Sequence, residues 1–384
     1  MKVHLWDAYN PNKISVDLNK NLKDKIRELI GDKIYSTAKI LKIHPTRLYD
    51  YFIYQKTPIP LSILLKISKL FNIPLLEIEK NIILYKNMFV PLKNSIKNPK
   101  LPLEIDPYFT SLIANLFFDG SVPEDGKGTY YHQKDEKIMN DFISKVKTIF
   151  GDVQYSLRKD HRGVLKCRLP RLIGEICREV YKVNSFGTFN SRVPDLVYTY
   201  VREHKLAFIL TGILDEGSIT YDGSIQFGVS NKNMVEDFKR LCNDVGLNTS
   251  NIGENKLNHY YYLYIKSPEK FYSILQEFNK KYPLVSLRYK KERLKDYLEI
   301  KNHPGLRNKT GGDDRKRRIL LSLKEEKTIN SLSKDLLILP RSLRRHLDIL
   351  IKRKLISKRK IGRENYFYLT FGKPNCFSVD LNSE

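Results

Sequence analysis

Residues 206–219 read Leu-Ala-Phe-Ile-Leu-Thr-Gly-Ile-Leu-Asp-Glu-Gly-Ser-Ile, and the rest of the chain is interpreted around this stretch. An apolar run with small residues is followed by two acids, a glycine and a β-favouring Ser-Ile pair. The pattern predicts a buried helix that ends at Gly217 and turns directly into a strand. Glu216 would lie in the last helical turn, where the helix dipole disfavours a carboxylate. A carboxylate at this unfavourable position is readily explained if its role is to bind a cation.

A second stretch with the same plan lies earlier in the chain. Residues 112–122 read Leu-Ile-Ala-Asn-Leu-Phe-Phe-Asp-Gly-Ser-Val, so that Asp119 takes the place of Glu216. One such acid alone is as easily a solvated helix end as a cation ligand. Two copies favour the cation-binding interpretation.

The segments that follow the two acids also match. In each copy a strand pattern, an amphipathic helix, two more strand-like runs and a closing helix follow at nearly the same offsets. Residues 107–301 are therefore predicted to be an internal duplication of an α-β-β-α-β-β-α unit. Ala114 and Thr211 occupy the small positions through which the two leading helices would pack.

This pattern resembles the LAGLIDADG homing endonucleases, in the single-chain form that carries two motifs. The resemblance implies an α+β fold with a pseudo-twofold αββαββα core, and a monomer that acts on both strands of DNA. It implies site-specific, metal-dependent hydrolysis of double-stranded DNA, with Mg²⁺ or Mn²⁺ held by Asp119 and Glu216. Asn115, Phe117 and Phe118 depart from the family motif, and the second motif fits only after deletion of one residue before Glu216.

Basic and aromatic residues alternate along the expected strands of this region. In the family a lysine near the end of the last strand organises the attacking water, and that place falls on Lys266. Arg168 is the matching residue in the first copy. A solvated strand end is an equally good interpretation of Lys266. Arg158 and Lys166 lie on a sheet face that would meet a DNA duplex.

Residues 1–85 are predicted to be a helical domain, and residues 86–106, rich in proline and lysine, a linker. The order of short helices resembles a phage-repressor type of helix-turn-helix, whose recognition helix would span residues 46–54. The side chains expected to face DNA are Arg47, Tyr49, Tyr51 and Gln55. The alternative is a plain helical domain that packs on the next one.

A loop rich in glycine and asparagine, residues 302–312, marks a further linker, and residues 313–384 follow it. Two helices, a long basic helix over residues 341–354 and a hairpin resemble a winged helix-turn-helix domain. The apolar residues of the long helix share one face, so its basic residues lie opposite. A solvated basic face is the alternative. The residues expected to contact DNA are Arg341, Arg344, Arg345 and Lys352 of the helix, with Lys358, Arg359, Lys360 and Arg363 of the wing.

The composition also points to a polyanionic partner. Lys and Arg number 68 against 43 Asp and Glu, which gives a formal net charge of +25. A lysine-rich proteome would explain part of this charge but not its clustering. The four cysteines lack the spacing of a zinc or disulfide framework. No signal peptide opens the chain, and no apolar run approaches the ~20 residues of a membrane helix. We expect a cytoplasmic protein that binds no membrane.

Different functions fit these patterns. The first is the endonuclease, which the retained Asp119 and Glu216 favour. The second is a non-catalytic DNA-binding transcription regulator with a degenerate LAGLIDADG-like domain, since a bacterial sporulation-regulator family fuses such a domain to a helix-turn-helix. The two flanking domains and Phe117 favour the regulator. A binder of structured RNA, or a splicing maturase, is a third and weaker interpretation.

Overall fold

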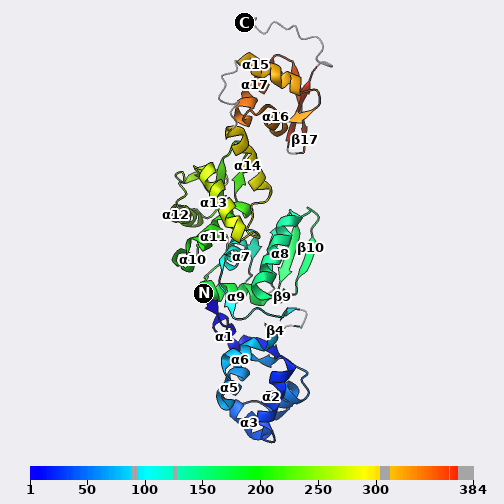
Figure 1. Ribbon diagram of the computed structural model, residues 1–384, viewed down its shortest axis with the longest axis vertical. Coiled ribbons are helices and arrows are strands. Elements are labelled where there is room, and N and C mark those ends of the chain that lie inside the picture. The colour runs from blue at the N-terminus through cyan, green and yellow to red at the C-terminus, as the bar shows by residue number, and fades with distance from the viewer. Residues whose placement is uncertain (89–90, 92–93, 124–127, 303–311, 363, 371–384) are drawn as a thin grey trace.

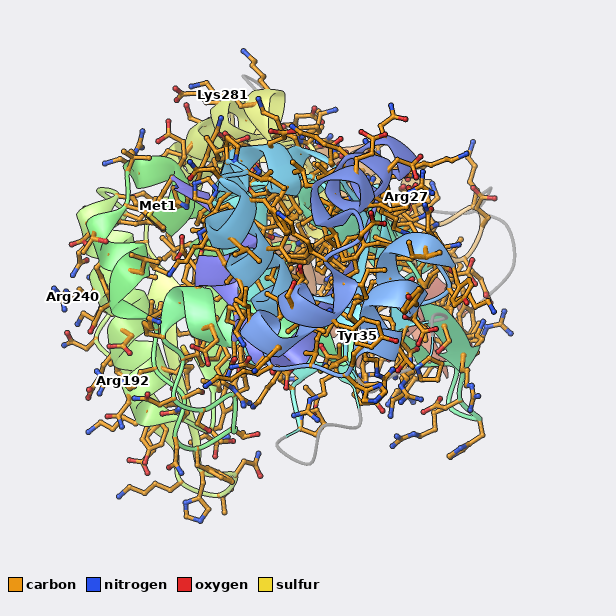
Figure 2. The ribbon with its side chains drawn as sticks, turned by 90° about the horizontal axis from the view of Figure 1, so that it is seen from below. Met1, Arg27, Tyr35, Arg192, Arg240 and Lys281 are labelled. Atoms are coloured by element: carbon orange, nitrogen blue, oxygen red, sulfur yellow. The ribbon has the colours of Figure 1, made fainter. Side chains whose placement is uncertain are left out.

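The computed structural model describes residues 1–88, 91, 94–123, 128–302, 312–362 and 364–370. An N-terminal part, a central core and a C-terminal part follow one another along the long axis of the molecule (Figure 1). Seen from the N-terminal end, side chains such as Arg27, Arg192, Arg240 and Lys281 project from the periphery (Figure 2). Within the described residues, no helix is both long and apolar enough to cross a membrane. The fold mixes helices with small antiparallel sheets.

The central core contains two units with the same order of elements, except that the first has one additional strand, β9 (Asp152–Val153), which belongs to a different sheet. The first consists of α7 (Pro107–Phe117), β7 (Gly120–Ser121), β8 (Thr129–Gln133), α8 (Glu136–Phe150), β9 (Asp152–Val153), β10 (Ser156–Lys159), β11 (Leu165–Leu169) and α9 (Arg171–Tyr181). After α10 (Asp195–Thr199), the second consists of α11 (Arg202–Asp215), β12 (Ser218–Ile219), β13 (Ile225–Val229), α12 (Lys232–Asp244), β14 (Gly253–Asn255), β15 (Tyr260–Ile265) and α13 (Pro268–Lys281). The two sheets run in the orders β10-β11-β8-β7 and β12-β13-β15-β14, so equivalent strands occupy equivalent places. The order of elements expected from the repeat is the one observed.

Local chemistry explains where the first unit begins and turns. Helix α7 starts at Asp106, whose carboxylate accepts a hydrogen bond from the backbone N–H of Phe109 at 2.9 Å. The helix ends at Phe117. Gly120 then folds back against it so closely that a Cβ at this position would lie 2.5 Å from the Cα of Leu116. Along β11 the side chains alternate, with Cys167 buried and Lys166 exposed. The strand therefore turns a basic face away from the helices.

Helices α7 and α11 pack against one another at the centre of the core (Figure 1). Both are buried over most of their length. Ser111 Oγ and Thr211 Oγ1 lie 2.7 Å apart across the interface. We expected Ala114 to be the partner of Thr211. The hydrogen-bonded partner is Ser111, one turn earlier, because buried hydroxyls need hydrogen-bond partners and these two lie within reach of each other.

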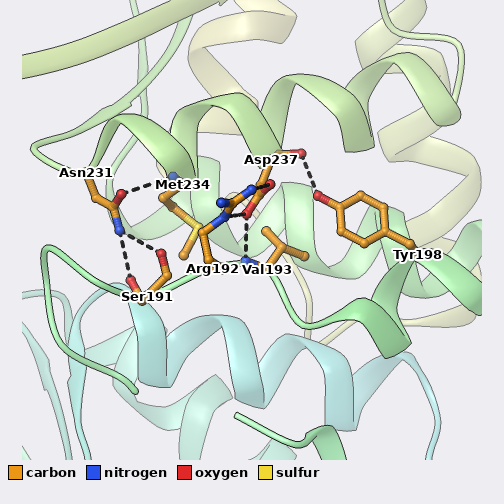
Figure 3. Close-up of polar contacts among 7 residues, drawn as sticks. All are labelled: Ser191, Arg192, Val193, Tyr198, Asn231, Met234 and Asp237. Carbon is orange, nitrogen blue, oxygen red and sulfur yellow. Dashed lines mark hydrogen bonds and ion pairs between the residues drawn. The ribbon is translucent and has the colours of Figure 1, made fainter. Parts of the chain in front are cut away.

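Each unit is tied to the other by the segment that follows its last helix. After α9, Arg192 donates two hydrogen bonds to Asp237 of α12, at 2.6 and 2.7 Å, and the backbone N–H of Val193 donates a third at 3.1 Å (Figure 3). After α13, Arg288 pairs with Asp141 of α8 in the same two-pronged way. This exchange of anchors fixes the position of one unit against the other.

The N-terminal part packs short helices on a sheet. Its helices are α1 (Leu5–Ala8), α2 (Lys20–Ile30), α3 (Ile34–Leu41), α4 (Pro45–Leu48), which continues as a π turn (Tyr49–Ile53), α5 (Leu61–Phe71) and α6 (Leu75–Lys80). Strands β2 (Ile14–Leu18), β3 (Ile59–Pro60), β4 (Ile82–Asn87) and β5 (Ile96–Lys97) join β9 in the order β3-β2-β4-β5-β9. The sheet was not expected from the sequence, and it links this part to the core through β9.

Residues 86–106, which we expected to be a linker, contain paired strands. Strand β5 pairs with β9, and β6 (Leu103–Glu104) pairs with β1 (Lys2–Val3). Ile96 and Leu103 are fully buried. The prolines and lysines hid these strands because each strand is short and its partner is far away in the chain.

The C-terminal part has a core of its own, which includes Ile319, Leu332, Leu343 and Leu347. Its elements are α15 (Gly312–Ser322), β16 (Lys327–Thr328), α16 (Ile329–Leu336), α17 (Pro340–Lys352), β17 (Ile356–Ile361) and β18 (Glu364–Leu369), with sheet order β16-β18-β17. Helix α14 (Tyr289–Asn302) leads towards it from the core (Figure 1). Residues 303–311 of the expected linker lie outside the described residues.

Candidate active site

Three carboxylates gather where α7 and α11 end. Asp119 follows α7, Asp215 is the last residue of α11, and Glu216 follows it. All three are half-buried. Burial, and then the negative charges of Asp215 and Glu216, raise the pKa of Asp119 to about 8. The ends of the two helices therefore bring three partly desolvated carboxylates close enough to affect one another's pKa.

Asp215 points from the second unit into the first. It accepts hydrogen bonds from Asn115 Nδ2 at 2.8 Å and from the Tyr131 hydroxyl at 2.9 Å. Burial raises the pKa of Asp215 to about 6, although these two donors act to lower it. The sequence did not single out Asp215 because nothing in a local pattern shows which of two adjacent acids turns inward.

Lys145 of α8 is the buried cation behind Asp215. Its Nζ donates to Ser111 Oγ at 2.6 Å and to the side-chain oxygen of Asn115. Burial lowers the pKa of Lys145 to about 8, while the negative charge of Asp215 acts in the opposite direction. A continuous polar chain thus runs from Thr211 through Ser111, Lys145 and Asn115 to Asp215.

Lys290 of α14 places a second buried ammonium at the end of α11. Its Nζ donates to the carbonyl oxygens of Ile213 at 2.9 Å and Gly217 at 2.8 Å, and also to that of Leu214. Burial lowers the pKa of Lys290 to about 8, against the effect of the nearby Asp215. These carbonyls carry the negative end of the helix dipole, so the ammonium stabilises the helix terminus.

Glu216 lies close enough to Lys290 to be affected by its charge. Burial raises the pKa of Glu216, and Lys290 acts to lower it. Asp119 receives a long contact from Gln133 Nε2, at 3.5 Å. Asp119 and Glu216 are thus the two carboxylates whose oxygens are least engaged with neighbouring donors.

The described side chains could supply only part of the coordination shell of a divalent cation. Among the described residues, no group of three or more His, Cys, Asp or Glu side chains is arranged to hold a metal ion. Two carboxylates, Asp119 and Glu216, are nevertheless enough for Mg²⁺, which usually binds one or two carboxylates and completes its shell with water and substrate phosphate. Burial, and then the charges of Asp215 and Glu216, raise the pKa of Asp119 although Lys290 acts to lower it. The residues present therefore fit Mg²⁺ or Mn²⁺ shared with a phosphate.

Lys266 and Arg168 were expected to assist the acids. Lys266 is exposed just after β15, and its backbone N–H donates to Asn248. Arg168 is exposed on β11, with its guanidinium 5.9 Å from the centre of the Tyr130 ring. Lys290 is the basic residue whose charge acts on the pKa values of all three acids, and Lys145 also acts on Asp215. Lys290 reaches the acids because α14 packs back against the end of α11, and no local sequence pattern indicates this packing.

The outer faces of the two sheets differ in chemistry. In the first unit Arg158, Lys166 and Arg168 are exposed, and Lys166 Nζ lies 4.5 Å from the centre of the Tyr130 ring. In the second unit the outer face carries a row of tyrosines, which are Tyr260, Tyr262 and Tyr264. One face offers phosphate contacts and the other offers stacking surfaces and hydroxyls.

The residues expected to face DNA in the N-terminal part are only partly accessible. Arg47 is exposed and Tyr49 is half-buried. Tyr51 is buried, at 6% exposure, and Gln55 donates to Asp24 at 3.1 Å. Tyr51 packs inward because the helix widens into a π turn after Leu48, which rotates the following side chains relative to a regular α-helix.

The basic residues expected in the C-terminal part are exposed. They are Arg341, Arg344, Arg345 and Lys352 on α17, with Lys358, Arg359 and Lys360 on β17. Arg363 lies outside the described residues. Arg344 is 3.6 Å from Asp222 of the core, and Arg359 donates to Glu326 at 3.0 Å. Two of these arginines thus have acidic partners in the absence of DNA.

Comparisons with known proteins give likenesses of fold at low sequence identity. No protein-family model and no curated protein matches the chain. Mesophilic variants of the homing endonuclease I-DmoI align over 45% of this chain and 93% of their own, with 14% identity and a TM-score of 0.32. Full-length DUF199/WhiA from Thermatoga maritima aligns over 64% of this chain and 90% of its own, with 12% identity and a TM-score of 0.35. The N-terminal LAGLIDADG domain of DUF199/WhiA aligns over 48% and 86%, with 12% identity and a TM-score of 0.32. Likeness at this level says nothing about activity, which rests on the residues of this chain.

Proposed function

We propose that this chain is a divalent-metal-dependent endonuclease that cuts double-stranded DNA at a chosen site. The observation that carries the proposal is the group of Asp119, Asp215 and Glu216 at the adjoining ends of α7 and α11. Burial first, and then repulsion from Asp215 and Glu216, raise the pKa of Asp119 to about 8 even with Lys290 nearby. A divalent cation shared with a phosphate group would relieve this repulsion.

The residues of the site would divide the work. Asp119 from the first unit and Glu216 from the second would hold Mg²⁺ or Mn²⁺. When bound, such a cation neutralises the phosphate and lowers the pKa of a coordinated water. Asn115 and Tyr131 would keep Asp215 turned inward, and Lys290 would hold the end of α11 so that Glu216 keeps its place.

Each of the two duplicated units would act on one strand of a DNA duplex. With pseudo-twofold symmetry between the units, one monomer would offer one acid to each scissile phosphate. The basic face of the first sheet and the tyrosine face of the second would lie on the DNA. The N-terminal part, as a helix-turn-helix domain, and the C-terminal part, as a winged helix-turn-helix domain, would add affinity and choice of site.

Cleavage of a plasmid library with a randomised target tests the proposal. The wild type should linearise a subset of the library in Mg²⁺ or Mn²⁺. Asp119→Asn and Glu216→Gln should each abolish double-strand cutting while they leave duplex affinity nearly unchanged, and each should leave nicking of one strand. Glu254→Gln, which removes an exposed acid on β14, is the matched control and should cut normally. Undiminished cutting by either active-site variant would place the chemistry elsewhere.

A DNA-binding regulator that does not cut is the second candidate. The observation that favours it is that the site already has internal counter-charges. Lys290 uses the carbonyls at the end of α11, and Asp215 places both carboxylate oxygens on Asn115 and Tyr131. A site neutralised in this way needs no metal to remain folded. Tight duplex binding by a wild type that cuts no member of the library, in Mg²⁺ or Mn²⁺, would favour the regulator.

A further inference from the structure

The N-terminal part contains a groove of about 660 Å³ that is separate from the acid cluster. Its floor is one row of the sheet, because Ser15 of β2 lies directly opposite Pro60 of β3 on one side and Lys86 of β4 on the other. Residues opposite one another in antiparallel strands point to the same face. This row therefore lies together beneath the helices.

The walls of the groove come from the turn that leads into α4. Ile43, His44 and Arg47 line one side, with Tyr51 of the π turn beneath them. Ile63 of α5 lines another side. The walls thus combine apolar and basic side chains, and they belong to the segment that we expect to approach DNA.

Two hydroxyl groups in the lining have no hydrogen-bond partner. Ser15 is 4% exposed, and neither its Oγ nor the Oγ1 of Thr57 makes a hydrogen bond. Buried polar atoms without a partner cost free energy, so such atoms usually mark a place for a ligand or an ordered water. Two of them on one groove indicate a built polar recess.

The lining is basic. Lys86 is buried at 8% exposure, and Arg47 and His44 lie on the wall. No acidic side chain is among the described residues that line the groove. The Lys86 ammonium lies 3.5 Å from the carbonyl oxygen of Met88. Burial lowers the pKa of Lys86, so an arriving anion would strengthen its charged form.

We propose that this groove binds a small organic anion whose charged oxygens lie beside Lys86 and whose polar groups meet Ser15 and Thr57. The apolar part of the molecule would lie against Ile43 and Ile63. A carboxylate and a phosphate monoester share this chemistry. A volume of this size is typical of small-molecule sites that combine apolar walls with a few polar groups.

Thermal unfolding of the full chain with paired compounds tests the proposal. One panel pairs monocarboxylic acids with their methyl amides, and the other pairs phosphate monoesters with the corresponding alcohols. We expect at least one anion to raise the melting temperature in proportion to the logarithm of its concentration, and its neutral counterpart to have no effect. The panel that contains the active anion distinguishes a carboxylate from a phosphate ligand.

Lys86→Met keeps the length of the side chain and removes the charge, and it should weaken binding of the active anion at least tenfold. Lys69→Met, which changes an exposed lysine of α5, should leave binding unchanged. Ser15→Ala provides a second variant that is less prone to misfold, and it should weaken binding severalfold. No shift by any anion at millimolar concentration would overturn the proposal. Equal stabilisation of wild type and Lys86→Met would also overturn it, as would complete displacement of the anion by a short duplex DNA.

Discussion

Replacement of Asp119 by asparagine should make the protein more stable at neutral and alkaline pH. The side chain keeps its shape and loses a charge that Asp215 and Glu216 repel. Asp119 is half-buried, so water relieves only part of this repulsion. The prediction is the opposite of the usual effect of changing a residue in a packed core. It follows from the burial of Asp119 first and from the neighbouring charges of Asp215 and Glu216 second.

The size of the effect follows from the pKa shift. Asp119 moves from an ordinary pKa of 3.8 to about 8. At 1.36 kcal/mol per pKa unit, this shift corresponds to ~6 kcal/mol as an upper limit. Asp119 is partly exposed to solvent, and Asp215 or Glu216 can carry the shared proton in its place. We therefore expect the variant to gain about 2 kcal/mol of unfolding free energy. A gain of that size raises the melting temperature of a unit of roughly 200 residues by about 4–8 °C.

The gain should depend on pH in a defined direction. A carboxyl whose folded pKa is raised binds more protons in the folded state between pH 3.8 and about 8. Folding stability is therefore lost as pH rises through this window, and the asparagine variant avoids the loss. The difference between variant and wild type should be small near pH 4 and largest at pH 8 and above.

Chemical denaturation at several pH values, with and without Mg²⁺ or Mn²⁺, measures these differences. The cation should stabilise the wild type more than Asp119→Asn, because the variant lacks the charge that the cation neutralises. Glu254→Gln, at an exposed position, should show neither effect. A destabilised Asp119→Asn variant at pH 8, or a stability difference that grows towards pH 4, would refute the raised pKa of Asp119 and with it the buried, like-charged setting of this carboxylate.

Three further predictions concern other parts of the molecule. Burial lowers the pKa of His204 to about 4, so the neutral imidazole stabilises the folded state only above that pH. As pH falls from 6.5 towards 4, the wild type should lose about 2 kcal/mol of unfolding free energy relative to His204→Gln in denaturation curves. Gly212→Val should destabilise the core by about 1–3 kcal/mol, since its Cβ would lie 2.8 Å from a ring carbon of Phe238; an unchanged melting temperature would contradict the close helix packing. Duplex affinity should fall steeply with salt, and Arg345→Ala should reduce the slope of log affinity against log salt by about one; affinity no better than millimolar at low salt would end the nucleic-acid proposal.

The sequence by itself determined the order of elements in the core. The repeat around Asp119 and Glu216 and the alternation along strands such as β11 depend on contacts within a few residues. Helix period, capping and turn chemistry act over that range, so they are visible in a single sequence. The helices and hairpin of the C-terminal part could be predicted for the same reason. The glycine C-caps were not found: α7 ends at Phe117 and α11 at Asp215, with Phe118 and Glu216 as their cap residues.

Only the tertiary structure decided how the candidate site is built. Asp215 turns to Asn115 and Tyr131, and Lys290 reaches the end of α11 from a helix far along the chain. The inward turn of Tyr51 was hidden in the same way. These placements depend on how distant segments pack, and the packing sets the burial that shifts the pKa values. Local patterns carry no record of such contacts, because the same residues on an isolated helix would simply face water.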